Sequence, residues 1–140
     1  MKSSLQVRIQ SLLFETALAT PRVGSGKLAS AIVYRGNIIS VGFNQNKTHP
    51  MQLKWMVNPK RITLHAEVNA LCRASRILNE YEFSRSSIYV ARVKKEEIRG
   101  NWTYGMAKPC AGCMRCIMSF GIRELWYSTD DGDFERLRLN

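Results

Sequence analysis

The sequence contains no long hydrophobic run. No stretch approaches the roughly 20 apolar residues that a membrane-spanning helix needs, so we expect no membrane partner. Lys2 precedes apolar residues, as in a signal peptide, but Arg8, Gln10 and Glu15 interrupt them. We therefore predict an amphipathic helix over residues 1–20, in a cytoplasmic protein. Its apolar positions recur at helical spacing: Leu5, Ile9, Leu12, Leu13 and Leu18.

Acidic residues are also scarce. Eleven Asp and Glu oppose 21 Lys and Arg, which gives a formal net charge of +10. Such an excess favours an anionic partner, from a nucleotide phosphate up to a nucleic acid. The basic residues are scattered along the chain, however, as on an ordinary solvated surface. Net charge alone therefore identifies no binding face.

Cysteine and histidine are few, with four and two copies. A disulfide between Cys110 and Cys113 would staple one helical turn and constrain almost nothing, so metal binding or catalysis is the better interpretation. The 140 residues suffice to bury a core without disulfides. We expect one domain over residues 1–140, with 1–20 as an N-terminal helix and a core at about 29–132.

The pattern of residues predicts alternating helices and strands after an opening hairpin. Strands flanking Arg35-Gly36-Asn37 form the hairpin. The later elements are a helix at 65–78, a strand at 87–93, a charged connection at 94–108, a helix at 110–120 and a strand at 122–128. This order indicates the α/β class, with a mixed sheet and helices on its faces.

The segment "KPCAGCMRC" places Cys110, Cys113 and Cys116 at three-residue intervals. A CxxC in the first helical turn points both sulfurs toward the helix N-terminus, where free N–H groups favour negative charge. Pro109 stands where a proline helps to start a helix. The segment fits half of a metal site, which is either a closed structural site or an open catalytic one.

The segment "LHAEVNA" supplies the other candidate ligand. His65 stands at the start of the other predicted helix, and Glu67 follows two residues later. A metal ligand beside a carboxylate is the pairing that a hydrolytic zinc centre needs, because the carboxylate can take and return a proton. The alternative is that both residues merely cap a helix.

H-x-E followed by P-C-x-x-C is the signature of zinc deaminases. With the segments "IVYRGNIISVGFNQNKTHP", "IYVARV" and "GIRELWYSTDDG", the sequence resembles the cytidine and deoxycytidylate deaminase superfamily. The resemblance implies one zinc ion on His65, Cys110 and Cys113, with Glu67 as proton shuttle. It also implies a three-layer α-β-α sandwich with a five-stranded mixed sheet. The fifth strand would come from the C-terminal "ERLRL".

Cys116 raises two alternatives, a closed Cys3His zinc site and a partial ferredoxin-like run. Phe120 follows where a ferredoxin spacing needs its fourth cysteine. On a helix, the sulfur at position 116 lies about 9 Å beyond that at 110, which argues against the closed site. We interpret Cys116 and Cys72 as small buried apolar residues.

Substrate contacts are predicted on the resemblance. "GFN" matches the family segment whose asparagine contacts the sugar, which suggests Asn44, and the resemblance adds Ala66. "NKTHP" is similar to a loop of phage-type deoxycytidylate deaminases, so Lys47, Thr48 and His49 are candidates for sugar or phosphate binding. The alternative is an ordinary polar turn before Pro50.

We expect hydrolytic deamination of a free pyrimidine nucleotide or nucleoside, foremost dCMP to dUMP. A second hypothesis is a polynucleotide deaminase acting on cytosine or adenine, because the net charge is positive. Trp55 lies in the loop before the helix at 65–78, and Trp102 and Tyr104 lie in the 94–108 connection, where aromatic rings can stack on bases. A third is a noncatalytic zinc-stabilised module, which the intact Glu67 disfavours. The resemblance also implies a homo-oligomer, and the 94–108 connection would serve as a lid, an oligomer contact or a nucleic-acid surface.

Overall fold

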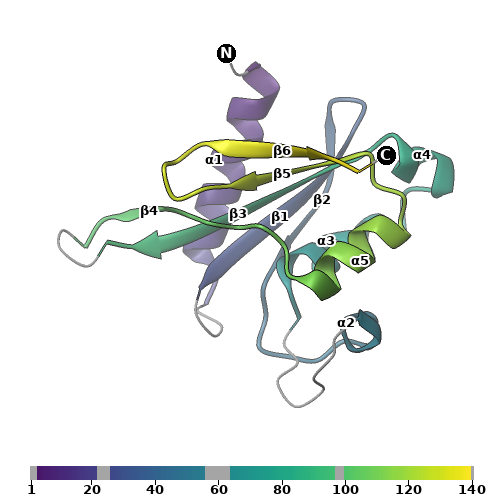
Figure 1. The fold of residues 1–140 in the computed structure, drawn as a ribbon, viewed down its shortest axis with the longest axis horizontal. Coiled ribbons are helices and arrows are strands. Elements are labelled where there is room, and N and C mark those ends of the chain that lie inside the picture. Colours follow the sequence, from purple (N-terminus) through teal and green to yellow (C-terminus); the bar gives the residue numbers. More distant parts are fainter. Residues whose placement is uncertain (1–2, 22–25, 56–63, 97–99, 140) are drawn as a thin grey trace.

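A mixed β-sheet with helices on both faces forms the core of the protein (Figure 1). The computed structural model describes residues 3–21, 26–55, 64–96 and 100–139. Its elements are α1 (Ser4–Ala19), β1 (Lys27–Tyr34), β2 (Asn37–Phe43), α2 (Pro50–Trp55), α3 (Ala66–Ala74), α4 (Glu80–Ser84), β3 (Ser87–Lys95), β4 (Trp102–Gly105), α5 (Ala111–Ser119), β5 (Glu124–Ser128) and β6 (Phe134–Arg138).

The strands follow the order β2-β1-β3-β5-β6, and β4 pairs with β3. Only β3 and β5 run parallel; the other pairings are antiparallel. The predicted α/β class and the hairpin of β1 and β2 are confirmed. Arg35 and Gly36 both have positive φ, 51° and 75°, which is the backbone that a tight two-residue hairpin turn requires.

The sheet has six strands, so the prediction of five is wrong. The predicted C-terminal strand exists as β6, and β4 adds one inside the segment interpreted as a connection. β4 forms because β5 leaves part of β3 unpaired. β5 pairs with Ser87–Val90 only, and β4 pairs with Arg92–Lys95 further along the same edge. Ser128 links the two, because its Oγ accepts the Arg92 N–H and donates to the Gly105 carbonyl.

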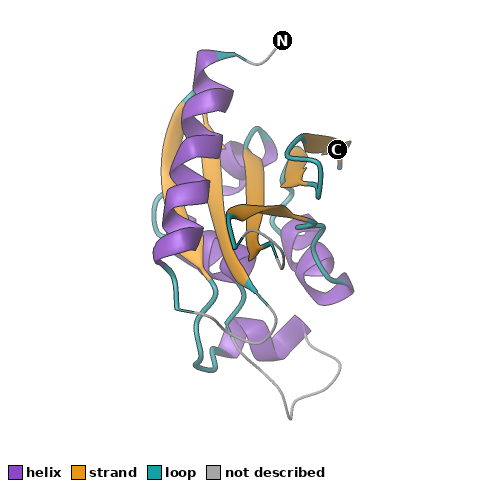
Figure 2. Ribbon diagram, turned by 90° about the vertical axis from the view of Figure 1, so that its left-hand side faces the viewer, coloured by secondary structure: helices purple, strands orange, loops and turns teal. Residues whose placement is uncertain are grey.

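Helices cover both faces of the sheet, as the predicted three-layer sandwich requires (Figure 2). The two faces bury separate apolar clusters. α1 packs on one face through Ile9, Leu13 and Ala17, which confirms the amphipathic N-terminal helix. α3 and α5 pack on the other face. Side chains alternate between faces along the central strands, so that Ile88 and Val90 point toward α3 and α5 while Tyr89 and Ala91 face α1.

Several predicted boundaries shift. α3 ends at Ala74 rather than residue 78, and the short helices α2 and α4 were not predicted. Residues 97–99 of the expected connection lie outside the described residues. None of the described helices has the length and apolar character needed to cross a bilayer. The cytoplasmic location and the division into domains stay predictions.

Candidate metal centre

α3 carries His65 to the site because it packs very closely on β2. A Cβ atom on Gly42 would lie 2.4 Å from the Ala70 nitrogen and 2.6 Å from the Ala66 oxygen, so only glycine permits this approach. The Ser40 hydroxyl donates to the Ala70 carbonyl at 2.7 Å. His65 is the N-cap residue of α3 with extended backbone, and its ring makes no capping hydrogen bond. The ring is therefore available for other contacts.

α5 brings the two cysteines to the same place. Its N-cap is Cys110, whose sulfur accepts the Cys113 N–H at 3.5 Å, as expected for a thiolate at a helix N-terminus. The helix begins at Ala111, two residues after Pro109, so Pro109 does not occupy its first position. Ala107 fixes the approach to α5, because its N–H donates to the Ser128 carbonyl at 2.9 Å.

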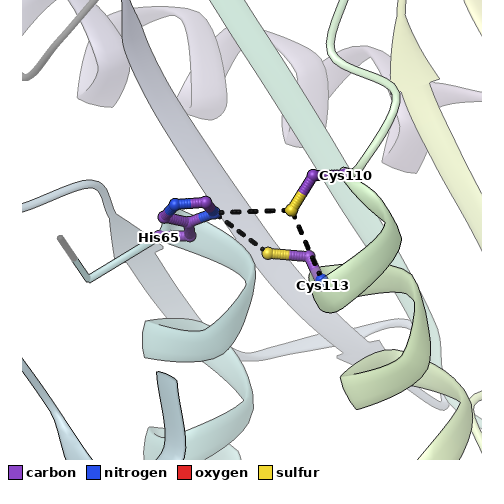
Figure 3. A group of neighbouring side chains, drawn as sticks. All are labelled: His65, Cys110 and Cys113. Carbon is purple, nitrogen blue, oxygen red and sulfur yellow. Dashed lines mark hydrogen bonds between the residues drawn. The ribbon is translucent and has the colours of Figure 1, made fainter. Parts of the chain in front are cut away.

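His65, Cys110 and Cys113 converge on one point (Figure 3). Their ligand atoms all lie within 4.8 Å of one another. The His65 Nδ1 atom lies 3.1 Å from Cys113 Sγ and 3.8 Å from Cys110 Sγ. A tetrahedral zinc ion bound by nitrogen and sulfur separates such atoms by about 3.6 Å. The donor set and its spacing therefore fit zinc, with a fourth position left over.

The protonation of these groups suits a metal site. Hydrogen bonds from Cys113 and His65 lower the pKa of the Cys110 thiol to about 3, against the effect of partial burial. The hydrogen bond with Cys110 also raises the pKa of His65, with a smaller contribution from the charge of Glu67. The pKa of Cys113 is raised by its hydrogen bond to Cys110 and by burial. The cluster thus holds one thiolate even without an ion.

Glu67 lies in the first turn of α3 and is only 4% exposed. Burial raises the pKa of its carboxyl group, while a hydrogen bond from Cys113 and the charge of His65 oppose that rise. A carboxyl group with a raised pKa holds a proton more readily, which suits a group that accepts and then donates one. The alternative that His65 and Glu67 merely cap α3 lacks support from the His65 ring, which makes no capping bond.

Cys116 and Cys72 stand apart from the metal ligands. Among the described residues, the group of potential ligands comprises His65, Cys110 and Cys113 alone. Cys116 is fully buried in the apolar cluster beneath α5, and burial raises its pKa to about 12. Cys72 packs against the same cluster and against His49. The geometry therefore supports an open three-ligand site rather than a closed Cys3His site.

The predicted substrate contacts differ in their burial. Asn44 is buried, accepting the Leu28 N–H and donating to the Gly26 carbonyl. Lys47 and Thr48 are exposed. Ala66 is buried in the first turn of α3.

His49 turns toward α3 instead of standing free in its loop. Its Nδ1 accepts the Met51 N–H at 3.1 Å, and its Nε2 lies 3.8 Å from Cys72 Sγ. His49 is thus not among the residues that converge with His65 on the metal position.

Gln52 is a neighbour of the centre that sequence reasoning did not single out. Its side chain is fully buried, and its Oε1 accepts the His65 N–H at 3.0 Å. Among the described residues, its Nε2 has no hydrogen-bond partner. Because α2 has six residues and follows a polar loop, no periodic pattern marks Gln52 in the sequence.

The family model of the cytidine and deoxycytidylate deaminase zinc-binding region matches residues 6–129. The chain belongs to this family. It is accordingly a zinc-dependent deaminase, and Zn²⁺ is its cofactor, as the sequence predicted. A search of curated protein sequences gave no match.

Two solved structures of a dCMP deaminase from the cyanophage S-TIM5 share the fold of this deaminase. The complex with dCMP and dUMP has a TM-score of 0.59 at 19% identity, covering 92% of this chain and 84% of that one. The apo form has a TM-score of 0.56 at 19% identity, covering 92% and 86%. The predicted cytidine-deaminase-like fold is thereby confirmed.

Proposed function

We propose that this deaminase converts dCMP to dUMP, with His65, Cys110 and Cys113 as zinc ligands and Glu67 as the proton carrier. The convergence of one imidazole and two thiol groups beside a buried carboxyl group carries the proposal. The substrate rests on the similar fold of a deaminase crystallised with dCMP and dUMP, and on the likeness of "NKTHP" to phage deoxycytidylate deaminases.

The reaction adds water to C4 of the cytosine ring and releases ammonia. Zinc, when bound, lowers the pKa of a water molecule to about 7 and so provides a nucleophile at neutral pH. Glu67 takes the proton that this water loses and delivers it to ring nitrogen N3 as the C4–O bond forms. Glu67 then moves the proton of the new C4 hydroxyl group to the amino group as the C4–N bond breaks, which leaves ammonia and a uracil ring with a C4 carbonyl.

Substrate contacts complete the proposal. Asn44 uses one N–H on the Gly26 carbonyl and one oxygen lone pair on the Leu28 N–H, so a second N–H and a second lone pair remain for a sugar hydroxyl group. Lys47 and Thr48 offer a cation and a hydroxyl group to the phosphate. Ala66 supplies backbone and a small side chain beside the ring, and His49 places this loop through its contact with Cys72.

Ammonia release from cytidine, deoxycytidine, CMP, dCMP and single-stranded DNA and RNA tests the proposal. Glu67→Gln should retain bound zinc and lose at least about 100-fold in turnover of dCMP, because positioned proton transfer contributes about 10²–10⁴. Glu80→Gln on exposed α4 is the matched control and should be fully active. Near-normal turnover in Glu67→Gln contradicts the role of Glu67. Activity on single-stranded DNA or RNA alone would contradict dCMP as the substrate and support the polynucleotide hypothesis.

A further inference from the structure

The short helix α2 contacts both of the helices that carry the proposed zinc ligands. It lies beside the ends at which α3 and α5 begin (Figure 1). Its six residues are fewer than a helix needs to be stable alone in water. Contacts with the rest of the protein therefore hold α2 in place, and these contacts show what α2 connects.

Two contacts attach α2 to α3. Gln52 is fully buried, and its Oε1 accepts the N–H of His65, the N-cap residue of α3, at 3.0 Å. Nearer the start of α2, the Cys72 thiol donates to Met51 Sδ at 3.4 Å. Since Cys72 lies near the far end of α3, the two contacts fix both the position and the direction of α2 on that helix.

Arg115 attaches the other end of α2 to α5. Its Nη2 atom donates to the Trp55 carbonyl oxygen at 3.1 Å. Trp55 is the last residue of α2, where carbonyl groups lack partners within the helix and carry partial negative charge. A guanidinium group at this end both satisfies a carbonyl group and complements the helix dipole. Arg115 is thus suited to hold α2.

The place of Arg115 on α5 relates this contact to the metal centre. Arg115 follows Cys113 by two residues on the same helix. It is exposed, and the ion pairs among the described residues are Lys94–Asp130 and Arg136–Glu124, so none of the described carboxylates engages it. Its guanidinium group is therefore directed to the Trp55 carbonyl group by geometry and not by a neighbouring acid.

We propose that Arg115 is a positioning residue for the metal centre. Arg115 holds α2 on α5 while Gln52 holds α2 on the N-cap of α3, so that His65 and Cys113 keep their spacing before a metal ion binds. A site whose spacing is fixed in advance loses less free energy to ordering its ligands, so it binds the ion more tightly. This role rests on the proposed zinc ligands, and Arg115 acts on them through α2.

Arg115→Met tests this role, because methionine is a good helix former that lacks the N–H donors. We expect zinc affinity, measured by competition with a chromophoric chelator, to fall about tenfold, as for other residues that orient metal ligands. Loss of a positive charge would by itself favour a bound cation, so charge does not explain a fall. The KM for dCMP at saturating zinc should not change.

Two further variants serve as controls. Arg115→Lys keeps a charged N–H donor at this position and should recover most of the lost zinc affinity. Arg8→Met removes an exposed arginine of α1 and should bind zinc like the parent protein.

Four results would overturn the role of Arg115. Unchanged zinc affinity in Arg115→Met means that the spacing does not depend on this contact. An equal loss in Arg8→Met, or no recovery in Arg115→Lys, means that the donor to α2 is not the cause. A raised KM for dCMP with unchanged zinc affinity assigns Arg115 to substrate binding instead.

His65→Ala separates a failure of this inference from a failure of the proposed function. Zinc bound as tightly in His65→Ala as in the parent contradicts the proposed ligands themselves. Loss of zinc in His65→Ala, together with normal zinc affinity in Arg115→Met, contradicts the role of Arg115 alone.

Discussion

Two of the three proposed zinc ligands, His65 and Cys110, are N-cap residues of helices. Their backbones are extended, with ψ of 152° and 167°, so each side chain leaves its helix at the end where free N–H groups gather. That position stabilises negative charge on sulfur. Cys113, one turn into α5, completes the set from inside the core.

Gln52 also acts at the scale of single residues, because its side chain accepts a hydrogen bond from the backbone of His65, a proposed ligand. Gln52→Met removes the acceptor of the His65 N–H and leaves that donor unpaired beside the core. We expect a loss of about 1–3 kcal/mol in the free energy of unfolding. We also expect zinc affinity to fall about 10–100-fold, as for other residues that orient metal ligands.

Competition for zinc with a chromophoric chelator and thermal unfolding measure the two effects of Gln52→Met. Leu53→Met, at the exposed neighbouring position on α2, is the control and should match the parent protein. Lower stability with unchanged zinc affinity would mean that Gln52 only packs and does not orient His65.

At the scale of elements, the contact between α3 and β2 fixes His65. Asn69 supports this contact, since its Oδ1 accepts the Phe43 N–H at 3.1 Å and a Gln45 side-chain N–H at 3.2 Å. Ser40 adds the bond to the Ala70 carbonyl. The helix therefore has little freedom to slide along the sheet, and a ligand at its first residue inherits that rigidity.

Gly42→Ala should separate these two elements. Its Cβ would meet backbone atoms of α3 at 2.4 Å and 2.6 Å, and backbone cannot turn aside as a flexible side chain can. We expect destabilisation of about 1–3 kcal/mol or more, with weaker zinc binding because His65 moves with α3. Urea unfolding and zinc titration would measure both changes.

Gly105→Ala is the matched control for Gly42→Ala. The nearest atoms to its Cβ belong to the flexible side chains of Arg92 and Lys94, at 3.4 Å, which is ordinary contact. Its stability should stay close to that of the parent. A stable Gly42→Ala variant with unchanged zinc affinity would show that the tight packing of α3 on β2 is not required by the site.

At the scale of the whole molecule, the proposed zinc site joins two helices that lie far apart in sequence. Removing zinc with a chelator should lower the melting temperature, because a ligand that binds only the folded state stabilises that state. Free zinc at about 100 times its Kd contributes about 2.7 kcal/mol, which corresponds to several degrees. Differential scanning fluorimetry with and without added zinc would measure the shift. An identical melting temperature at both conditions contradicts a zinc site that spans α3 and α5.

The expected homo-oligomer and the possibility of a nucleic-acid partner stay predictions at this scale. The net charge of +10 is a property of the whole chain, and it indicates an anionic partner without placing one. One cavity is lined by Arg35, Arg85 and Arg123. They meet there because β1, β3 and β5 are neighbours in the sheet.

The sequence alone determined those features of the protein that depend on residues close together in the chain. The spacing of "PCAGC" and "HAE" predicted three zinc donors and a role for Glu67, because such roles depend on residue type and on neighbours within one helical turn. Hydrophobic periodicity and turn residues likewise predicted α1, the hairpin, α5 and most of the sheet.

Tertiary structure decided what depends on distant partners. β4 forms because β5 leaves part of β3 unpaired, and Gln52 reaches His65 because α2 packs beside α3. The meeting of Arg35, Arg85 and Arg123 around one cavity depends on strand order, which no local pattern encodes. Cys116 also shows the difference: the sequence gives it the same spacing as its neighbours, and only the direction of its side chain, into the core, separates it from the metal ligands.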